Sequence, residues 1–245
     1  MSELSVKEYK VWDLPTRLFH WLNFFSILLL MFVGLVMLYK DALGIQNVEA
    51  KIALKQLHVI IGYIFTINLA WRAIWAFFGN KHARWTEILP GKNYLVELKS
   101  YLRSVKSGSP KQFIGHNPAG KLSVMVIYLV LVIMAVTGLI RAGTDIYFPP
   151  FGTIAAEYVA KDGVDPASIL PYDKTNVNPE KYQTLSAFKR PIGIIHLYLS
   201  YFLMLIALLH IAAVVKAELS GSHGLVSAML SGRKRIAGTP EDGDL

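Results

Sequence analysis

Two histidines, His196 and His210, stand fourteen residues apart inside one long apolar segment of the chain. An α-helix rises about 1.5 Å per residue with 3.6 residues per turn, so the two imidazoles would lie about 21 Å apart on nearly the same helix face. Imidazole is costly in an apolar surrounding unless it has a partner, and it is the commonest metal ligand in proteins. The spacing therefore predicts two separate metal-binding levels along one helix.

Four long apolar segments would position these histidines, and they cover residues 18–38, 57–78, 121–140 and 193–215. Each reaches the roughly 20 residues that a helix needs to cross the hydrocarbon core of a bilayer, where helices satisfy their own backbone. We therefore predict an all-α integral membrane protein, a four-transmembrane-helix bundle that forms a single domain over residues 1–245. No Ala-x-Ala cleavage pattern follows the first segment, so we interpret it as a retained span.

Positive charges are distributed unevenly between the two sides of these spans. The two terminal segments and the second loop, with Lys121 counted in that loop, hold fifteen Lys and Arg residues, and the other two loops hold nine. The positive-inside rule then predicts that both termini are cytoplasmic. A net charge of +8 could indicate nucleic-acid binding, but the positive charges are sorted by membrane side, so we expect the lipid bilayer and no nucleic acid as a partner.

Two loops have a composition that indicates structure. The segment 141–192 becomes a long extracytoplasmic loop between the third and fourth helices, and it holds six of the eleven prolines. Its polar turns favour a structured docking cap, with a flexible linker as the alternative. In the second loop, residues 94–105 have an amphipathic, basic pattern typical of a helix on an anionic inner leaflet.

Topology pairs four histidines by membrane depth. His20 lies in the first turn of helix one, which starts in the cytoplasm, and His58 lies near the start of helix two, which starts outside. Helix four also starts outside, so His196 is near the outer surface and His210 near the inner one. The predicted pairs are His58 with His196 and His20 with His210, as two bis-histidine haems would require. The chain has no cysteine, so any haem is a non-covalent haem b.

Other interpretations of these histidines stay open. A histidine near a helix end is often an interfacial residue, and paired histidines also bind zinc, although neither level offers a carboxylate or thiolate nearby in sequence. A haem-free anchor or transporter would leave the four histidines without a purpose. The remaining histidines are expected to be solvated loop residues, and they are His82, His116 and His223.

Two arginines are candidates for pairing with the propionates of the inner haem. Arg72 lies fourteen residues after His58, at the cytoplasmic level of helix two, and Arg17 lies one turn before His20. A guanidinium suits a carboxylate there, and snorkelling to lipid phosphates is the alternative. Glycines within the spans would admit either a flat macrocycle or close helix packing, and they are Gly34, Gly62 and Gly138.

Several motifs resemble one known family. The segment 17–21, Arg-Leu-Phe-His-Trp, is similar to the Arg-x-x-His-Trp opening of the cytochrome b subunits of membrane-bound nickel–iron hydrogenases. Residues 75–80 resemble the end of that family's second span, and residues 115–118 resemble the segment before its third. His196 and His210 match its paired histidines in the fourth span. The likeness covers nearly the whole chain and extends to the bacterial dihaem cytochrome b superfamily, including the formate dehydrogenase gamma subunit.

The resemblance implies a respiratory-chain subunit of the bacterial inner membrane with two haem b groups. It would pass electrons between an extracytoplasmic redox partner, either a hydrogenase small subunit or a c-type cytochrome, and the quinone pool. In the formate dehydrogenase relatives an asparagine before the third span contributes to the quinone site, and Asn117 is its match. His116 is a candidate proton donor to that quinone. A self-contained quinone-linked oxidoreductase, such as a superoxide oxidase, is the alternative function.

Overall fold

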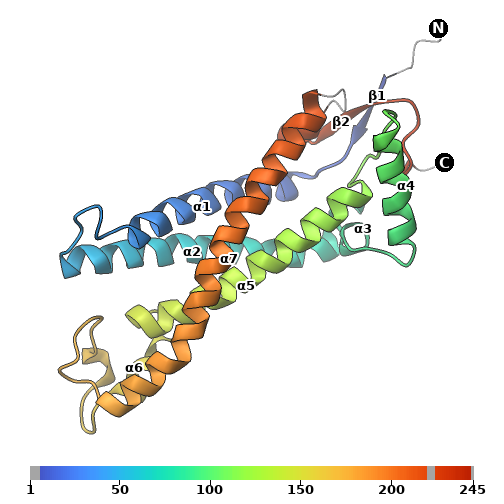
Figure 1. Ribbon diagram of the computed structural model, residues 1–245. Coiled ribbons are helices and arrows are strands. Elements are labelled where there is room, and N and C mark those ends of the chain that lie inside the picture. Colours follow the sequence, from blue (N-terminus) through green and yellow to red (C-terminus); the bar gives the residue numbers. More distant parts are fainter. Residues whose placement is uncertain (1–5, 220–223, 244–245) are drawn as a thin grey trace. The chain divides into compact units, whose positions relative to one another are not determined.

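The computed structural model of the protein describes residues 6–219 and 224–243. His223, one of the expected loop histidines, lies outside the described residues. Most of the described chain is helical (Figure 1).

Four helices are long and apolar enough to cross a membrane. They are α1 (Leu14–Leu38), α2 (Val48–Phe78), α5 (Pro118–Ile146) and α7 (Pro179–Leu219), and each contains one of the predicted apolar segments. The prediction of a helical membrane protein with four spans is confirmed.

The helices extend beyond the predicted spans, so the segment predicted as the loop 141–192 is helical at both ends. The largest extension is in α7, which already begins at Pro179. The Asn178 side chain accepts hydrogen bonds from the backbone N–H groups of Glu180 and Lys181, both at 3.1 Å. An asparagine cap followed by proline at the first helical position starts a helix independently of hydropathy. A hydropathy pattern reports only the apolar part of such a helix.

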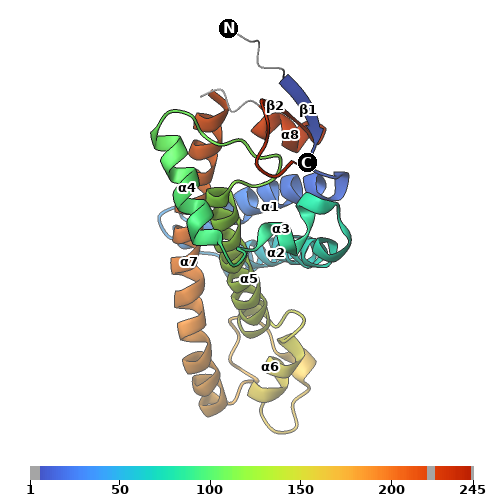
Figure 2. The ribbon, with the colours of Figure 1, turned by 90° about the vertical axis from the view of Figure 1, so that its right-hand side faces the viewer.

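The shorter elements lie in the loops and near the termini. The helical ones are η1 (Lys81–Ala83), α3 (Trp85–Ile88), α4 (Tyr94–Lys106), α6 (Gly152–Val159), η2 (Pro166–Ser168) and α8 (Leu225–Ser231). Strands β1 (Val6–Lys10) and β2 (Arg233–Ala237) form an antiparallel pair, with Val6 opposite Ala237 and Lys10 opposite Arg233 (Figure 2). This small sheet was not predicted, because it pairs charged segments from opposite ends of the chain.

The chain divides into two compact units, and each of the four long helices contributes to both. Unit 1 comprises Met1–Leu22, Asn68–Leu129 and Leu205–Leu245. Unit 2 comprises Asn23–Ile67 and Val130–Met204.

In unit 1 the carboxyl-terminal segment holds the start of α1 and the loop before α5. Val11 and Ile236 are fully buried and pack with Ile114. The Asp242 carboxylate accepts hydrogen bonds from the backbone N–H groups of Ile114 and Gly115, at 2.6 and 2.8 Å. These contacts hold the carboxyl-terminal segment against the residues before α1 and the loop before α5.

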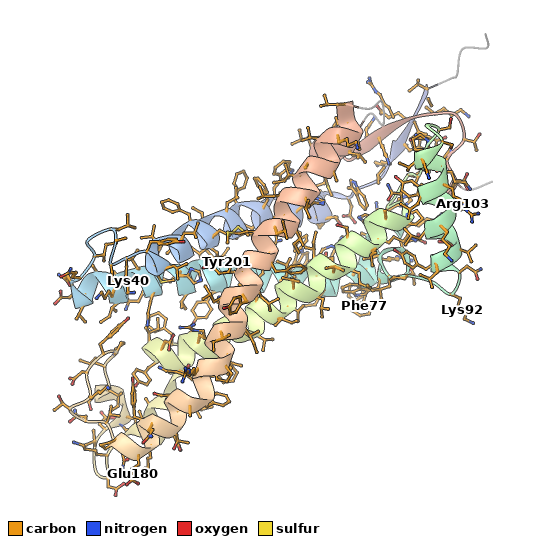
Figure 3. All side chains as sticks on the ribbon, in the orientation of Figure 1. Lys40, Phe77, Lys92, Arg103, Glu180 and Tyr201 are labelled. Carbon is orange, nitrogen blue, oxygen red and sulfur yellow. The ribbon has the colours of Figure 1, made fainter. Side chains whose placement is uncertain are left out.

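Helix α4 confirms the amphipathic helix predicted in the second loop. Its Tyr94 is buried and donates a hydrogen bond to the carbonyl of Pro118 at 2.9 Å, whereas Leu95 and Leu102 are exposed. Lys92 and Arg103 lie near opposite ends of the helix (Figure 3). An exposed apolar stripe beside basic residues is the pattern of a helix that lies on a bilayer surface.

In unit 2 the segment between α5 and α7 is structured, as predicted. Helix α6 lies in this segment (Figure 1), together with η2 and an isolated β-bridge from Ala160 to Val177, and the segment has a small apolar core. Its buried side chains are Ala155, Ala156, Val159, Ala160, Ile169, Val177 and Leu185. We call residues 147–178 the cap. A segment with its own apolar core is a folded part of the protein and not a flexible linker.

Candidate functional site

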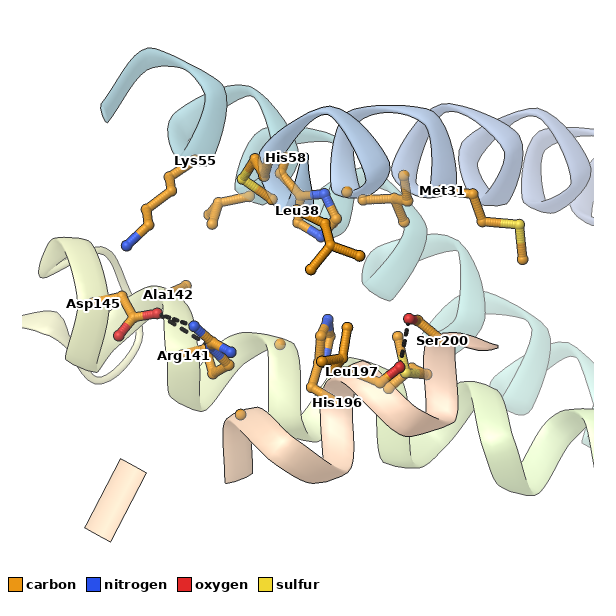
Figure 4. Close-up of a pocket in the computed structure, with 18 of the residues that line it drawn as sticks. Met31, Leu38, Lys55, His58, Arg141, Ala142, Asp145, His196, Leu197 and Ser200 are labelled. Carbon is orange, nitrogen blue, oxygen red and sulfur yellow. Dashed lines mark hydrogen bonds and ion pairs between the residues drawn. The ribbon is translucent and has the colours of Figure 1, made fainter. Parts of the chain in front are cut away.

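His58 on α2 and His196 on α7 face each other in unit 2, at opposite walls of one cavity (Figure 4). Their ring centroids are 6.4 Å apart and their planes are inclined by 74°. An imidazole nitrogen lies about 1.1 Å from its ring centroid and binds a first-row metal at about 2.0 Å, so two trans ligands have centroids about 6 Å apart. The pair is therefore spaced to hold one metal atom between the rings.

The cavity around the two rings has a volume of ≈ 470 Å³ and is lined mainly by apolar side chains. This size lies within the range of about 300–1,000 Å³ typical of cofactor sites. Gly34 and Gly138 line it, and a Cβ atom added to them would lie 3.6 Å from Cε1 of His58 and 3.4 Å from Cε1 of His196. Each glycine thus leaves open the space beside a histidine ring, which a flat group needs.

The Nδ1 atoms of the two rings have different surroundings. The Nδ1 atom of His196 lies 2.8 Å from the hydroxyl oxygen of Thr137. The Nδ1 atom of His58 is buried and has no hydrogen-bond partner among the described residues. In both cases no protein group of the described chain is bonded to Nε2, the nitrogen through which imidazole often binds a metal.

The cavity also has a charged end that the sequence analysis missed. Arg141 donates two hydrogen bonds to Asp145, at 3.1 and 2.6 Å, and Lys189 forms an ion pair with the same carboxylate at 2.9 Å. The Nζ atom of Lys55 lies 4.8 Å from the ring centroid of Tyr172 (Figure 4). Three cations around one carboxylate leave this end positive. The spacing of Arg141 and Asp145, four residues apart at the end of a span, was the available signal.

The second predicted pair, His20 on α1 and His210 on α7, lies in unit 1. The Nδ1 atom of His20 is buried without a hydrogen-bond partner among the described residues, and its ring packs edge-on against Trp21 at 5.4 Å. Each unit therefore contains one of the two pairs that topology assigned to different membrane depths.

Arg72 lies in the interior of unit 1 with only 3% of its side chain exposed. It donates a hydrogen bond to the carbonyl of Ala83 at 3.0 Å, and its guanidinium is 5.8 Å from the ring of Phe19 and 6.0 Å from that of Tyr128. Its Nη1 atom is buried and, within residues 6–219 and 224–243, has no hydrogen-bond partner. A guanidinium this deeply buried does not snorkel to lipid phosphates, and it has a donor to spare.

Arg17 contacts the carboxyl-terminal helix α8. Its guanidinium donates to the backbone carbonyl of Leu230, while Trp21 donates to the carbonyl of Met229 at 3.0 Å. The Nε atom of Arg17 is buried and unbonded in the described parts of the chain. Both residues of the Arg-x-x-His-Trp motif that flank His20 thus tie α1 to the carboxyl-terminal segment.

Asn117 caps helix α5. Its Oδ1 atom accepts a hydrogen bond from the backbone N–H of Gly120 at 2.7 Å, and its Nδ2 atom donates to the hydroxyl of Tyr101 at 3.0 Å. One N–H of the amide remains for another acceptor.

The expectation that His82 and His116 are solvated is wrong for His82 and only partly right for His116. His82 is 8% exposed, and a Cβ atom at Gly115 would lie 2.8 Å from its Nδ1 atom, so the missing side chain of this glycine lets the loop close over the ring. His116 is partly buried, with its ring 4.8 Å from that of Trp12. Burial and the nearby Arg72 lower the pKa of His116 to about 3, so it is uncharged at neutral pH.

Asp13 connects the start of α1 to the end of α2. Its carboxylate accepts hydrogen bonds from the backbone N–H groups of Thr16 and Asn80 and from the indole of Trp75, at 3.0 to 3.1 Å. Burial, the largest single influence, raises its pKa, but these hydrogen bonds together hold the pKa of Asp13 below its ordinary value. Trp75 and Asn80 begin and end the motif at the end of the second span, so this motif has a structural role.

The lowered pKa predicts how stability depends on pH. The ionised Asp13 stabilises the fold above its unfolded-state pKa, and this contribution is lost as pH falls through the lower folded-state pKa. Asp13→Ala should lower the free energy of unfolding by about 0.5–2 kcal/mol at pH 7, as expected for a lost helix cap. Thermal unfolding of the detergent-purified protein measures this, with Asp41→Ala at an exposed position as the control. An equal effect of Asp13→Ala at pH 7 and pH 3 would contradict the role of the ionised carboxylate.

Four helices able to span a membrane, with two histidines at metal-ligand spacing in a mainly apolar cavity, are the arrangement expected of a membrane cytochrome of the b type. The comparison with known families agrees. The chain belongs to the prokaryotic cytochrome b561 family, whose model matches residues 11–232.

Similar proteins have names of the same class. The chain is 26% identical to a probable Ni/Fe-hydrogenase B-type cytochrome subunit of Rhizobium leguminosarum bv. viciae, over 91% of this chain and 87% of the relative. It is 25% identical to a protein of that name from Cupriavidus necator, over 94% and 88% of the two chains. A third, from Azotobacter vinelandii, is 33% identical over 52% of this chain and 57% of the relative. No solved structure matches the chain significantly.

The family assignment confirms the resemblance drawn from the motifs, and it implies a b-type haem and electron transfer in the membrane.

Proposed function

We propose that this protein is the dihaem cytochrome b subunit of a hydrogenase complex and passes electrons between an extracytoplasmic hydrogenase and membrane quinone. The observation that carries the proposal is the facing pair His58 and His196, whose spacing of 6.4 Å fits one iron between two imidazoles. The names of the relatives support the hydrogenase as the redox partner.

The residues of unit 2 fit a non-covalent haem. His58 and His196 would bind the iron from opposite faces, and Gly34 and Gly138 leave room beside the rings. The excess of cations at the end of the cavity lined by Lys55 and Arg141 would favour the negatively charged propionates. Haem iron, when bound, supplies a reversible one-electron change between ferric and ferrous states. Two protein ligands leave no coordination position open to a substrate, which favours an electron carrier over an oxygen-binding site.

The residues of unit 1 would hold the second haem. His20 and His210 are the proposed axial ligands, and the spare donors of Arg17 and Arg72 suit its propionates. A buried guanidinium favours a bound carboxylate strongly because little water competes with it. Arg72 also lies beside aromatic rings that exclude water from this region.

Quinone would bind in unit 1 near the start of α5. Asn117 keeps one amide N–H for a quinone carbonyl after its two hydrogen bonds to Gly120 and Tyr101. His116 is uncharged at neutral pH, so it would take part in proton transfer as a neutral relay and not as a charged acid.

Sidedness follows from the distribution of charge and from the paired terminal strands. Because β1 and β2 pair, both ends of the described chain lie on one side, as an even number of spans requires. By the positive-inside rule, this side would be the cytoplasm, and the membrane would be the inner membrane of a bacterium. The cap would then face outward. A folded segment with its own core suits a protein partner better than a small diffusible substrate.

The experiment that tests the proposal starts from the detergent-purified protein. A pyridine haemochrome assay should give two haem b groups per chain. Membranes with the partner hydrogenase should then show haem reduction by hydrogen and reoxidation by added quinone. Well-folded protein without haem would overturn the site, and two haems that hydrogen does not reduce in the presence of the hydrogenase would overturn the proposed partner.

A further inference from the structure

Thr137 on α5 touches one ligand candidate and none of the other three among the described contacts. Its hydroxyl oxygen lies 2.8 Å from Nδ1 of His196. The same hydroxyl lies 2.7 Å from the carbonyl of Ile133 and 3.2 Å from that of Met134, one turn earlier on its own helix. Thr137 is buried, with 7% of its surface exposed, so water does not compete for these bonds.

The two sets of contacts favour one direction for the hydrogen bond. A hydroxyl has one hydrogen, and the carbonyls of Ile133 and Met134 can only accept it. The oxygen of Thr137 then accepts from the imidazole, so Nδ1 of His196 carries the proton. The lone pair of His196 is therefore on Nε2, on the edge of the ring away from Thr137.

His58, the opposite ligand candidate, has no such support. Its Nδ1 atom is buried and unbonded in the described part of the chain. The two rings are thus unequal, because an imidazole that donates a hydrogen bond through one nitrogen is a stronger electron donor through the other. A stronger donor favours the more positively charged, ferric iron.

We propose that Thr137 is a positioning residue that fixes the tautomer and orientation of His196 and lowers the reduction potential of the outer haem. The inference rests on the proposed haem between His58 and His196 and adds how the protein tunes it. It acts on this haem alone, because Thr137 and His196 both belong to unit 2, whereas His20 and His210 belong to unit 1.

The test compares three variants of the full-length protein in redox titrations and in haem-release assays. Thr137→Val keeps the shape of the side chain and removes the acceptor, whereas Thr137→Ser keeps the hydroxyl. The matched control is Thr66→Val, since Thr66 also lines the cavity and its hydroxyl donates only to the carbonyl of Gly62 at 2.7 Å.

Loss of a hydrogen bond to a metal ligand typically lowers metal affinity 10- to 100-fold. Thr137→Val should therefore release the outer haem about 10- to 100-fold more readily. The reduction potential of the outer haem should rise in this variant. A tenfold change in the ferric-to-ferrous preference corresponds to about 59 mV for one electron. Thr137→Ser and Thr66→Val should behave like the wild type, and the inner haem should keep its potential in all three.

The outcomes separate the inference from the proposed function. A wild-type protein without the outer haem would overturn both. A wild type with two haems and a Thr137→Val variant with unchanged affinity and potential would overturn the role of Thr137 alone. Equal shifts in both haems would also overturn it, because they would show a general loss of packing.

Discussion

Replacing His196 with alanine should leave the protein with one haem instead of two. The residue faces His58 across the cavity of unit 2, so the variant would lose one of the two imidazoles proposed to hold the iron there. His58→Ala should have the same effect. Haem content per chain, measured by the pyridine haemochrome assay, should fall by about half, which is far outside the error of such a measurement.

The inner pair should respond separately. His20→Ala and His210→Ala should remove the haem of unit 1 and leave that of unit 2, so the two groups of variants should retain different spectra and potentials. His116→Ala serves as the control, because this histidine is outside the four spans and should change neither haem. Loss of the same haem from His58→Ala and His210→Ala would refute the pairing.

Filling the cavity should exclude the outer haem even when both ligands are present. A Cβ atom at Gly138 would already lie 3.4 Å from Cε1 of His196, so the larger side chain of Gly138→Leu would occupy the space beside that ring. We expect about one haem per chain, with the inner haem unchanged. The measurement is the haem content together with the low-temperature reduced spectrum, in which the two haems are distinguished.

Gly62→Ala is the control for replacing a glycine of the same cavity. Gly62 lines the same cavity, but nothing lies within 4 Å of a Cβ atom placed there. The variant should therefore keep both haems. If Gly138→Leu also keeps both haems, the flat group does not lie beside His196 and the geometry of the proposed site is wrong.

The polar residues around the histidines were harder to predict than the histidines themselves. Arg141 and Asp145 pair across one helical turn, yet their partner Lys189 lies on another helix, so the positive end of the cavity exists only in the folded chain. Thr137 gave no signal in the sequence, since threonine in a span usually bonds to its own helix. Its contact with His196 joins residues 59 positions apart.

The amino-acid sequence by itself determined the four spans, and it predicted the class of cofactor and the assignment of four histidines to two levels, because hydropathy, helical rise and charge asymmetry are properties of local segments. Only the tertiary structure decided the sheet between β1 and β2, the burial of His82 and the ordered core of the cap. It also placed the hydroxyl of Thr137 beside Nδ1 of His196. Each of these features depends on contacts between residues that are distant in the chain, and local patterns carry no information about such contacts.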